Sequence, residues 1–249
     1  MSTTEPSSSR RGGLANVADV IIAPSAAFER LRVVPSWGWA FLVAALLAIA
    51  GALLTTPAVM HALETGLPAQ LAANPAIAKL PPDQQQKQIA AMLGISKAIS
   101  QWSWLAVPII LLVVGLVQGL IMTIANAAGR GDGGFKTFFA LSITVGVVGY
   151  GLHALVLGII ATVKGASTFE NTASVYAAVP SLALLAPGAH GAAAGFLAGL
   201  NVFSLWATVL LALGMTIVGR IPRAVAWATA VLMLLIAAAF TAYSAAQNG

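Results

Sequence analysis

One ionisable side chain inside a long apolar stretch is the first candidate for chemistry in this sequence. His153 lies within residues 137–163, which contain no charged side chain. An ionisable residue in such a stretch is a functional candidate by default. His153 therefore predicts a proton relay or a ligand contact. The alternative is that it is a neutral imidazole that hydrogen-bonds to one neighbouring hydroxyl or carbonyl. Catalysis by a serine nucleophile needs a paired base, and no Gly-x-Ser-Gly turn occurs here, so we expect no intramembrane serine protease.

Metal and phosphate chemistry find little support in the pattern of residues. His61 and Glu64 share one polar segment, and Glu170 and His190 share another, but their spacing defines no ligand set. The sequence has no cysteine. The Gly-rich stretch GRGDGG around Asp132 lacks the Lys-Ser/Thr of a phosphate-binding loop and follows no strand, so it predicts a turn. We therefore expect no catalytic residues, no metal, no cofactor and no enzymatic activity.

Polar side chains also occur at intervals within the apolar stretches. They line a cavity or form hydrogen bonds between helices, and we favour the second, because such bonds are frequent between membrane helices and contribute about 0.6 kcal/mol each. Asn201, which precedes Phe203 and Trp206, is our candidate for a contact specific to this fold. The set is Gln118, Asn126, Asn201, Ser204 and Thr208.

The composition places these residues in a membrane protein. Of 249 residues, 59% are hydrophobic and 8% are charged, against about 25% charged in soluble domains. Backbone polar groups in lipid must be paired internally, so we predict an all-α polytopic fold. Lengths of about 20 apolar residues predict five transmembrane helices. Their ranges are 37–60, 102–126, 137–163, 196–218 and 224–243.

Flanking segments are expected to surround a single membrane domain, residues 14–249. Residues 1–13 predict a disordered cytoplasmic tail. Residues 14–32 predict two short amphipathic helices in the headgroup layer, or else a simple hinge. Residues 61–101 predict an amphipathic segment with a helix start at Pro82 and Asp83. The apolar patch 173–186 predicts an interfacial or re-entrant segment.

Basic residues predict the orientation. With the amino terminus inside, every arginine and Lys136 are cytoplasmic, while Lys79, Lys87, Lys97 and Lys164 are outside. The carboxyl terminus is then periplasmic. The net charge of +5 is explained by these flanking residues, so we expect no nucleic-acid partner.

Three stretches carry a family resemblance. IIAPSAAFERLRVVPSWGW, GRGDGGFKTFFALS and FLAGLNVFSLWATVLLALGM resemble bacterial members of the Yip family, the Ypt/Rab-interacting integral membrane proteins. The similarity runs from Val17 to Ala239 in degenerate aromatic, Gly and Pro positions. It implies five spans, a cytoplasmic amino terminus, a place in the bacterial inner membrane, and a role in organising membrane or binding a partner.

Two hypotheses of different classes follow. The first is a non-enzymatic inner-membrane protein that binds a protein partner or organises the local membrane. Its expected partners are membrane lipid and a protein, and the sequence leaves an oligomer open. The alternative is a small-solute or lipid transporter or channel subunit with His153 in its path, for which His153→Ala should abolish flux in proteoliposomes. The expected lipid or partner contacts are Phe28, Arg30, Arg32, Trp37, Trp39, Phe135 and Lys136, and the intramembrane polar candidates are His153 and Asn201.

Overall fold

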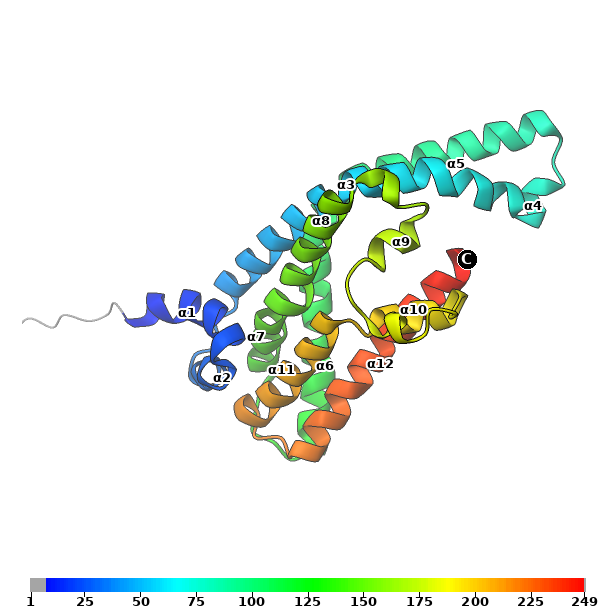
Figure 1. Cartoon of the computed structure of the whole chain (residues 1–249). Helices are drawn as coiled ribbons and strands as arrows, with labels where there is room; N and C mark the ends of the chain where they lie inside the picture. Colours follow the sequence, from blue (N-terminus) through cyan, green and yellow to red (C-terminus); the bar gives the residue numbers. More distant parts are fainter. Residues whose placement is uncertain (1–7, 249) are drawn as a thin grey trace, which may run out of the picture. The chain divides into compact units, whose positions relative to one another are not determined.

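The structure, a computed structural model, describes residues 8–248 and is built almost entirely of helices (Figure 1). It divides into two compact units that share the chain in alternation. The first unit holds the chain up to Ala48 with Pro108–His153 and Phe203–Ile236, and the second holds Ile49–Val107, Ala154–Val202 and the chain from Ala237. The expected all-α fold is confirmed. Residues 1–7 of the predicted tail lie outside the described residues, whereas residues 8–13 already belong to the first helix.

The α-helices follow one another with short connections. They are α1 Ser8–Ile22, α2 Pro24–Val33, α3 Gly38–Ala73, α4 Pro75–Ala78, α5 Pro82–Trp102, α6 Val107–Ala128, α7 Phe135–Gly146, α8 His153–Lys164, α9 Thr172–Tyr176, α10 Gly191–Gly199, α11 Val202–Val218 and α12 Arg223–Asn248. A π-helical stretch, Val147–Leu152, joins α7 to α8, and 3-10 turns occur at Ser103–Ala106, Ala166–Thr168 and Leu182–Leu185.

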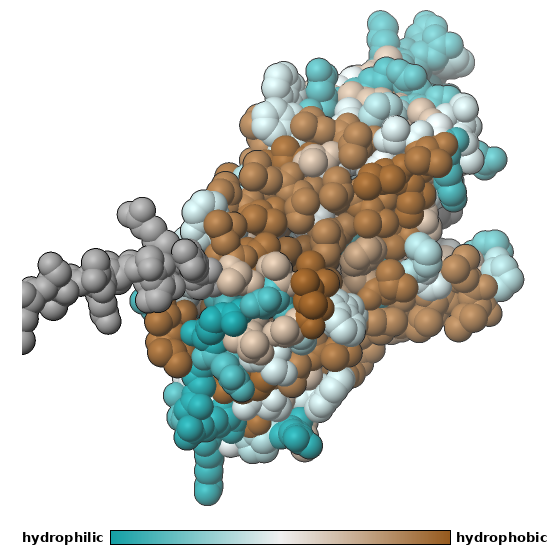
Figure 2. All heavy atoms as spheres, turned by 60° about the vertical axis from the view of Figure 1, so that its left-hand side comes forward, coloured by the Kyte–Doolittle hydropathy of each residue, from teal (hydrophilic) through white to brown (hydrophobic). Residues whose placement is uncertain are grey.

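Four helical stretches are long and apolar enough to cross a membrane. They are Gly38–Ala73, Pro82–Ala128, Phe135–Lys164 and Arg223–Ala246. They cover four of the five predicted spans. Figure 2 shows hydrophobic residues over most of the surface in view, with hydrophilic residues gathered in patches. This is the surface expected of helices that face lipid.

The predicted span 196–218 is not one continuous helix. Helix α10 ends at Gly199, and α11 begins at Val202 and has 17 residues, which is about 26 Å at 1.5 Å per residue and short of a 30 Å hydrocarbon layer. The backbone at the break pairs with an extended segment: Leu182 N donates to Leu200 O at 3.1 Å, and Val202 N donates to Pro180 O at 3.3 Å. These bonds keep the backbone groups of the break paired without a helix.

The first unit has a core in which the two amino-terminal helices take part. Phe28 and Leu31 of α2 and Val20 of α1 are fully buried beside Phe138 and Leu141 of α7. Val20, Phe28 and Leu31 pack within the protein, and the predicted place of α1 and α2 in the headgroup layer is not confirmed. The sequence pattern correctly indicates an apolar face but does not say whether lipid or protein covers it.

The second unit is organised around a close crossing of α3 and α8. A Cβ at Gly51 would lie 2.2 Å from the backbone carbon of Ala154, and one at Gly158 would lie 2.8 Å from Gly51 O. Glycine lets the two backbones approach this closely. In the first unit Gly119 does the same, since its Cβ would lie 3.2 Å from Phe139 Cα. Gly115 of the same helix also faces α7, since a Cβ there would lie 2.6 Å from Ile143 Cδ1.

The polar segments of the second unit contain more helix than the sequence indicates. Helix α3 continues past the predicted end at Met60 to Ala73, despite Pro57 and Pro68. Helix α5 begins at Pro82, as predicted. Lys97 of α5 forms an ion pair with Glu64 of α3. The apolar patch 173–186 forms only part of α9, a 3-10 turn and the bridge between Ser181 and Asn201.

Candidate functional site

Two loops meet at one end of the first unit. They connect α6 to α7 (residues 129–134) and α11 to α12 (residues 219–222), and together with Arg32 we call them the loop junction. Asp132 N donates to Gly219 O at 2.9 Å. A Cβ at Gly131 would lie 2.4 Å from Gly219 O, and one at Gly133 would lie 2.9 Å from Gly219 Cα. The stretch GRGDGG is therefore a turn, as predicted, and its glycines allow it to pack against the second loop.

The amide of Asn126 holds the first loop in place. Its Nδ2 donates to Gly133 O at 3.0 Å and to Gly131 O at 3.3 Å, and its Oδ1 accepts from Gly133 N at 3.2 Å. Asn126 is buried, and buried amides need such partners. The hydrogen bonds between helices expected of Asn126 are not seen; its amide bonds instead to the loop that follows α6.

The carboxylate of Asp132 lies between two arginines. Its Oδ2 is 3.5 Å from Arg32 Nη2 and 3.5 Å from Arg220 Nη1. The Asp132 and Arg220 side chains are 50% and 64% exposed, and ion pairs as exposed as these contribute at most about 1 kcal/mol. The pairs therefore orient the arginines more than they stabilise the fold.

Two arginines of the junction occupy a backbone conformation that favours glycine. Arg130 has φ 54° and Arg220 has φ 49°. Arg130 follows α6 in the position where Gly131 N donates back to Asn126 O at 2.9 Å, an arrangement whose left-handed residue is usually glycine. A left-handed backbone costs a residue with a Cβ about 1–2 kcal/mol. Arg130 and Arg220 therefore each carry this conformational energy cost.

The predicted contact residues divide into buried and exposed groups. Phe28 is 0% exposed and is not available for contact with lipid or a partner, because it fills the core between α2 and α7. Arg30 pairs with Asp19 and donates to Asn16 Oδ1 at 2.7 Å, so it ties α2 to α1. Phe135 and Trp39 are 41% and 47% exposed.

Aromatic rings connect the exposed residues to the core. Trp37 is half-buried and meets Phe139 edge-on at a centroid distance of 5.3 Å, and Phe135 stacks on Phe139 at 6.2 Å. Lys136 is exposed and follows Phe135 at the start of α7. Phe135 therefore packs on Phe139 while part of its ring stays exposed, Lys136 is exposed next to it, and Trp39 is exposed at the start of α3.

The intramembrane candidates have contacts other than those of the loop junction. His153 contacts the ring of Phe203 at a centroid distance of 5.6 Å, and Asn201 pairs through its backbone with Ser181. Gln118 forms the hydrogen bonds between helices that were predicted for it: Ser142 Oγ donates to Gln118 Oε1 at 2.6 Å, and Gln118 Nε2 donates to Tyr150 Oη at 3.2 Å. Its two partners were not among the predicted polar residues. These residues belong to α6, α7 and the π-helical stretch.

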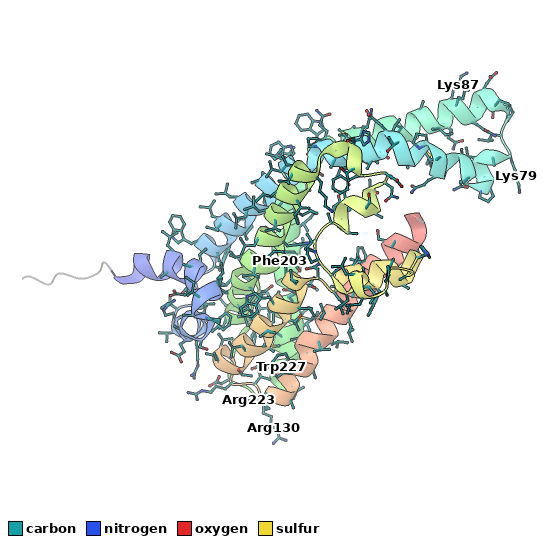
Figure 3. The ribbon with its side chains drawn as sticks, viewed as in Figure 1. Lys79, Lys87, Arg130, Phe203, Arg223 and Trp227 are labelled. Carbon is teal, nitrogen blue, oxygen red and sulfur yellow. The ribbon has the colours of Figure 1, made fainter. Side chains whose placement is uncertain are left out.

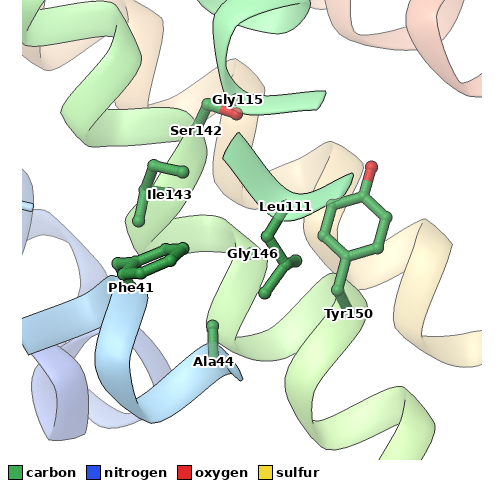
Figure 4. A pocket seen from close by; sticks show the side chains of 8 residues that line it. All are labelled: Phe41, Ala44, Leu111, Gly115, Ser142, Ile143, Gly146 and Tyr150. Atoms are coloured by element: carbon green, nitrogen blue, oxygen red, sulfur yellow. The ribbon is translucent and has the colours of Figure 1, made fainter. Parts of the chain in front are cut away.

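A small cavity lies beside this polar chain (Figure 4). Its volume of about 10 Å³ is at most the room that one water needs. It is lined by Phe41, Ala44, Leu111, Gly115, Ser142, Ile143, Gly146 and Tyr150. In this conformation the cavity does not hold a solute, so it gives the transport hypothesis no pathway.

Asp132 and Arg220 are the functional candidates that sequence reasoning missed. The sequence placed Arg220 only as a topology signal and Asp132 only in a turn. One signal was available, because Asp132 is the only acidic residue between Asp83 and Glu170, and it lies among cationic residues.

The fold and the apolar helices define an all-α integral membrane protein. No protein-family model matches the chain, so the resemblance to the Yip family is not confirmed. No solved structure matches it. The chain is similar to the membrane protein YknW of Bacillus subtilis strain 168, with 27% identity over 231 residues, 92% of this chain and 89% of that protein.

Proposed function

We propose that this protein is a non-enzymatic, multi-pass protein of the bacterial inner membrane that binds a protein partner or organises the surrounding lipid through the loop junction and its exposed neighbours. The observation that carries the proposal is the pair of exposed side chains, Phe135 and Lys136, that begin α7 directly after the first loop of the junction. It joins exposed aromatic and cationic side chains on a base held by Trp37 and Phe139. Aromatic and arginine side chains anchored in this way dominate the energetics of protein interfaces.

We further propose five crossings with the junction in the cytoplasm. The two loops lie at the same end of the first unit, and the stretch Phe135–Lys164, which leaves the first loop, is long enough to cross. The chain must cross again to return at residue 219, and α11 is the apolar helix that leads there. Its own length is short, and α10 with the paired break at Leu200–Asn201 supplies the remainder. A reporter fused after Gly249 should then be exposed outside; a cytoplasmic reporter would exclude five crossings.

Affinity capture of surface variants tests the function. The double variant Phe135→Ser with Lys136→Glu removes the exposed ring and reverses a charge, and neither side chain is part of the buried core. We expect it to reduce recovery of co-purifying protein or lipid at least tenfold, because loss of one anchor residue costs about 2 kcal/mol or more of binding.

The matched control lies on α5 of the second unit. Ile99→Ser with Lys87→Glu also replaces an exposed apolar residue and an exposed lysine. We expect its recovery to equal that of the unmodified protein. Equal recovery from both double variants would show that the surface around Phe135 is not the interaction site.

A further inference from the structure

The strained arginines of the junction are the starting point. Arg130 and Arg220 both lie in the left-handed region, with φ 54° and 49°. Glycine would adopt this conformation without penalty, and Gly129, Gly131 and Gly219 stand directly beside them in the sequence. The chain thus places arginine at the strained position itself. A topology signal requires only a positive charge somewhere in the loop, so it does not explain this placement.

The two arginines lie close to a third. A Cβ at Gly129 would approach Ile221 Cγ2 and Pro222 Cδ at 3.2 Å, which brings Arg130 next to the loop that carries Arg220 and leads into Arg223. Figure 3 shows Arg130 and Arg223 at the same end of the first unit, with Trp227 one turn further along α12. Arg130, Arg220 and Arg223 are exposed.

The junction carries more positive than negative charge. The two loops, Arg32 and Arg223 at the start of α12 together hold four arginines and one carboxylate, that of Asp132, which already pairs with Arg32 and Arg220. The guanidinium groups of Arg130 and Arg223 have no ion pair among the described residues. An anion is therefore the ligand that this cluster would attract.

We propose that Arg130, Arg220 and Arg223 bind the phosphate of an anionic phospholipid headgroup. The planar guanidinium donates two parallel hydrogen bonds to phosphate oxygens, which suits arginine to this ligand. Trp227 is 45% exposed on the α12 face that it shares with Arg223, and exposed tryptophan at a helix end marks the headgroup level. The loops join apolar helices, so the phosphate that reaches the arginines is that of a lipid. The proposal rests on the proposed function, because it names the lipid that part of the junction contacts.

Glycine substitution separates this role from folding. The double variant Arg130→Gly with Arg220→Gly removes two charges and relieves the backbone strain at both positions. Its fold should therefore be at least as stable as that of the unmodified protein. The full chain, purified in detergent, is mixed with equal amounts of phosphatidylglycerol and phosphatidylethanolamine, and bound lipids are counted by native mass spectrometry. We expect the preference for phosphatidylglycerol to fall on the order of tenfold in this variant, since each surface arginine contributes measurably to anionic lipid binding.

Two further variants serve as controls. Arg130→Lys with Arg220→Lys retains both charges and should keep most of the preference, whereas Lys79→Gln with Lys87→Gln removes two exposed cations of the second unit and should leave it unchanged. The thermal midpoint of the glycine variant should equal or exceed that of the unmodified protein.

Three results would overturn the proposal. They are an unchanged lipid preference in the glycine variant, an equal loss in the Lys79 and Lys87 control, and displacement of the bound lipid by excess inorganic phosphate, which would make the ligand a soluble phosphate. If the glycine variant loses its lipid while capture through Phe135 persists, the lipid site stands and the partner surface is separate. If capture through Phe135 fails while lipid selectivity persists, the proposed partner surface is wrong and the lipid site remains.

Discussion

Replacing Phe28 with alanine is expected to lower the free energy of unfolding by about 3–5 kcal/mol, the usual cost of removing a buried aromatic side chain. The ring is fully buried with Leu31, Phe138 and Leu141 in the core of the first unit. Its loss would leave a cavity between α2 and α7. Thermal unfolding of the purified protein in detergent measures the effect.

Ile22→Ala is the matched control for this prediction. Ile22 lies at the end of α1, next to the same pair of helices, and is 80% exposed. Its truncation should change the free energy of unfolding by less than about 0.5 kcal/mol. If Phe28→Ala were as mild as Ile22→Ala, the amino-terminal helices would not be docked in the core.

The second large effect is expected in the second unit, from Gly51→Ala. The new Cβ would lie 2.2 Å from both the carbon and the oxygen of the Ala154 backbone. Backbone atoms cannot rotate away as the end of a side chain does, so α3 and α8 must separate. We expect a loss of about 3 kcal/mol, at the upper end of what overpacking commonly costs, measured by the same thermal unfolding.

Gly94→Ala provides the comparison for the same chemical change. Gly94 lies within α5, and nothing lies within 4 Å of a Cβ built there. Alanine is a better helix former than glycine by about 1 kcal/mol, so this variant should be unchanged or slightly more stable. Equal destabilisation by the two substitutions would mean that the close crossing of α3 and α8 does not exist.

Much of the fold was accessible from the sequence because lipid imposes length and apolarity on any crossing helix. The ranges 102–126, 137–163 and 224–243 each fall within a long apolar helix, 37–60 does so from Gly38 onward, and the helix start at Pro82 also holds. Each rests on a local rule: hydrophobic length, or proline at a first helical turn.

Features that depend on tertiary contacts were less accessible. The break at Leu200–Asn201 lies in an apolar stretch with no local signal, because it is held by hydrogen bonds from Pro180 and Leu182. The burial of Phe28 depends on α7, which is distant in the sequence. In the sequence, Asp132 stands out only as an isolated acidic residue. Its place between Arg32 and Arg220 depends on α2 and the two loops of the junction coming together.

The proposed partner surface is tested most directly by photo-crosslinking in native membranes from a probe at Phe135, compared with a probe at Phe28. Phe135 is 41% exposed and Phe28 is fully buried, so the Phe28 probe should react only within its own chain. We predict that the Phe135 probe captures a reproducible protein or lipid species, and that Lys136→Glu weakens this capture. If the Phe135 probe captures no more than the Phe28 probe, the surface beside the loop junction is not an interaction site.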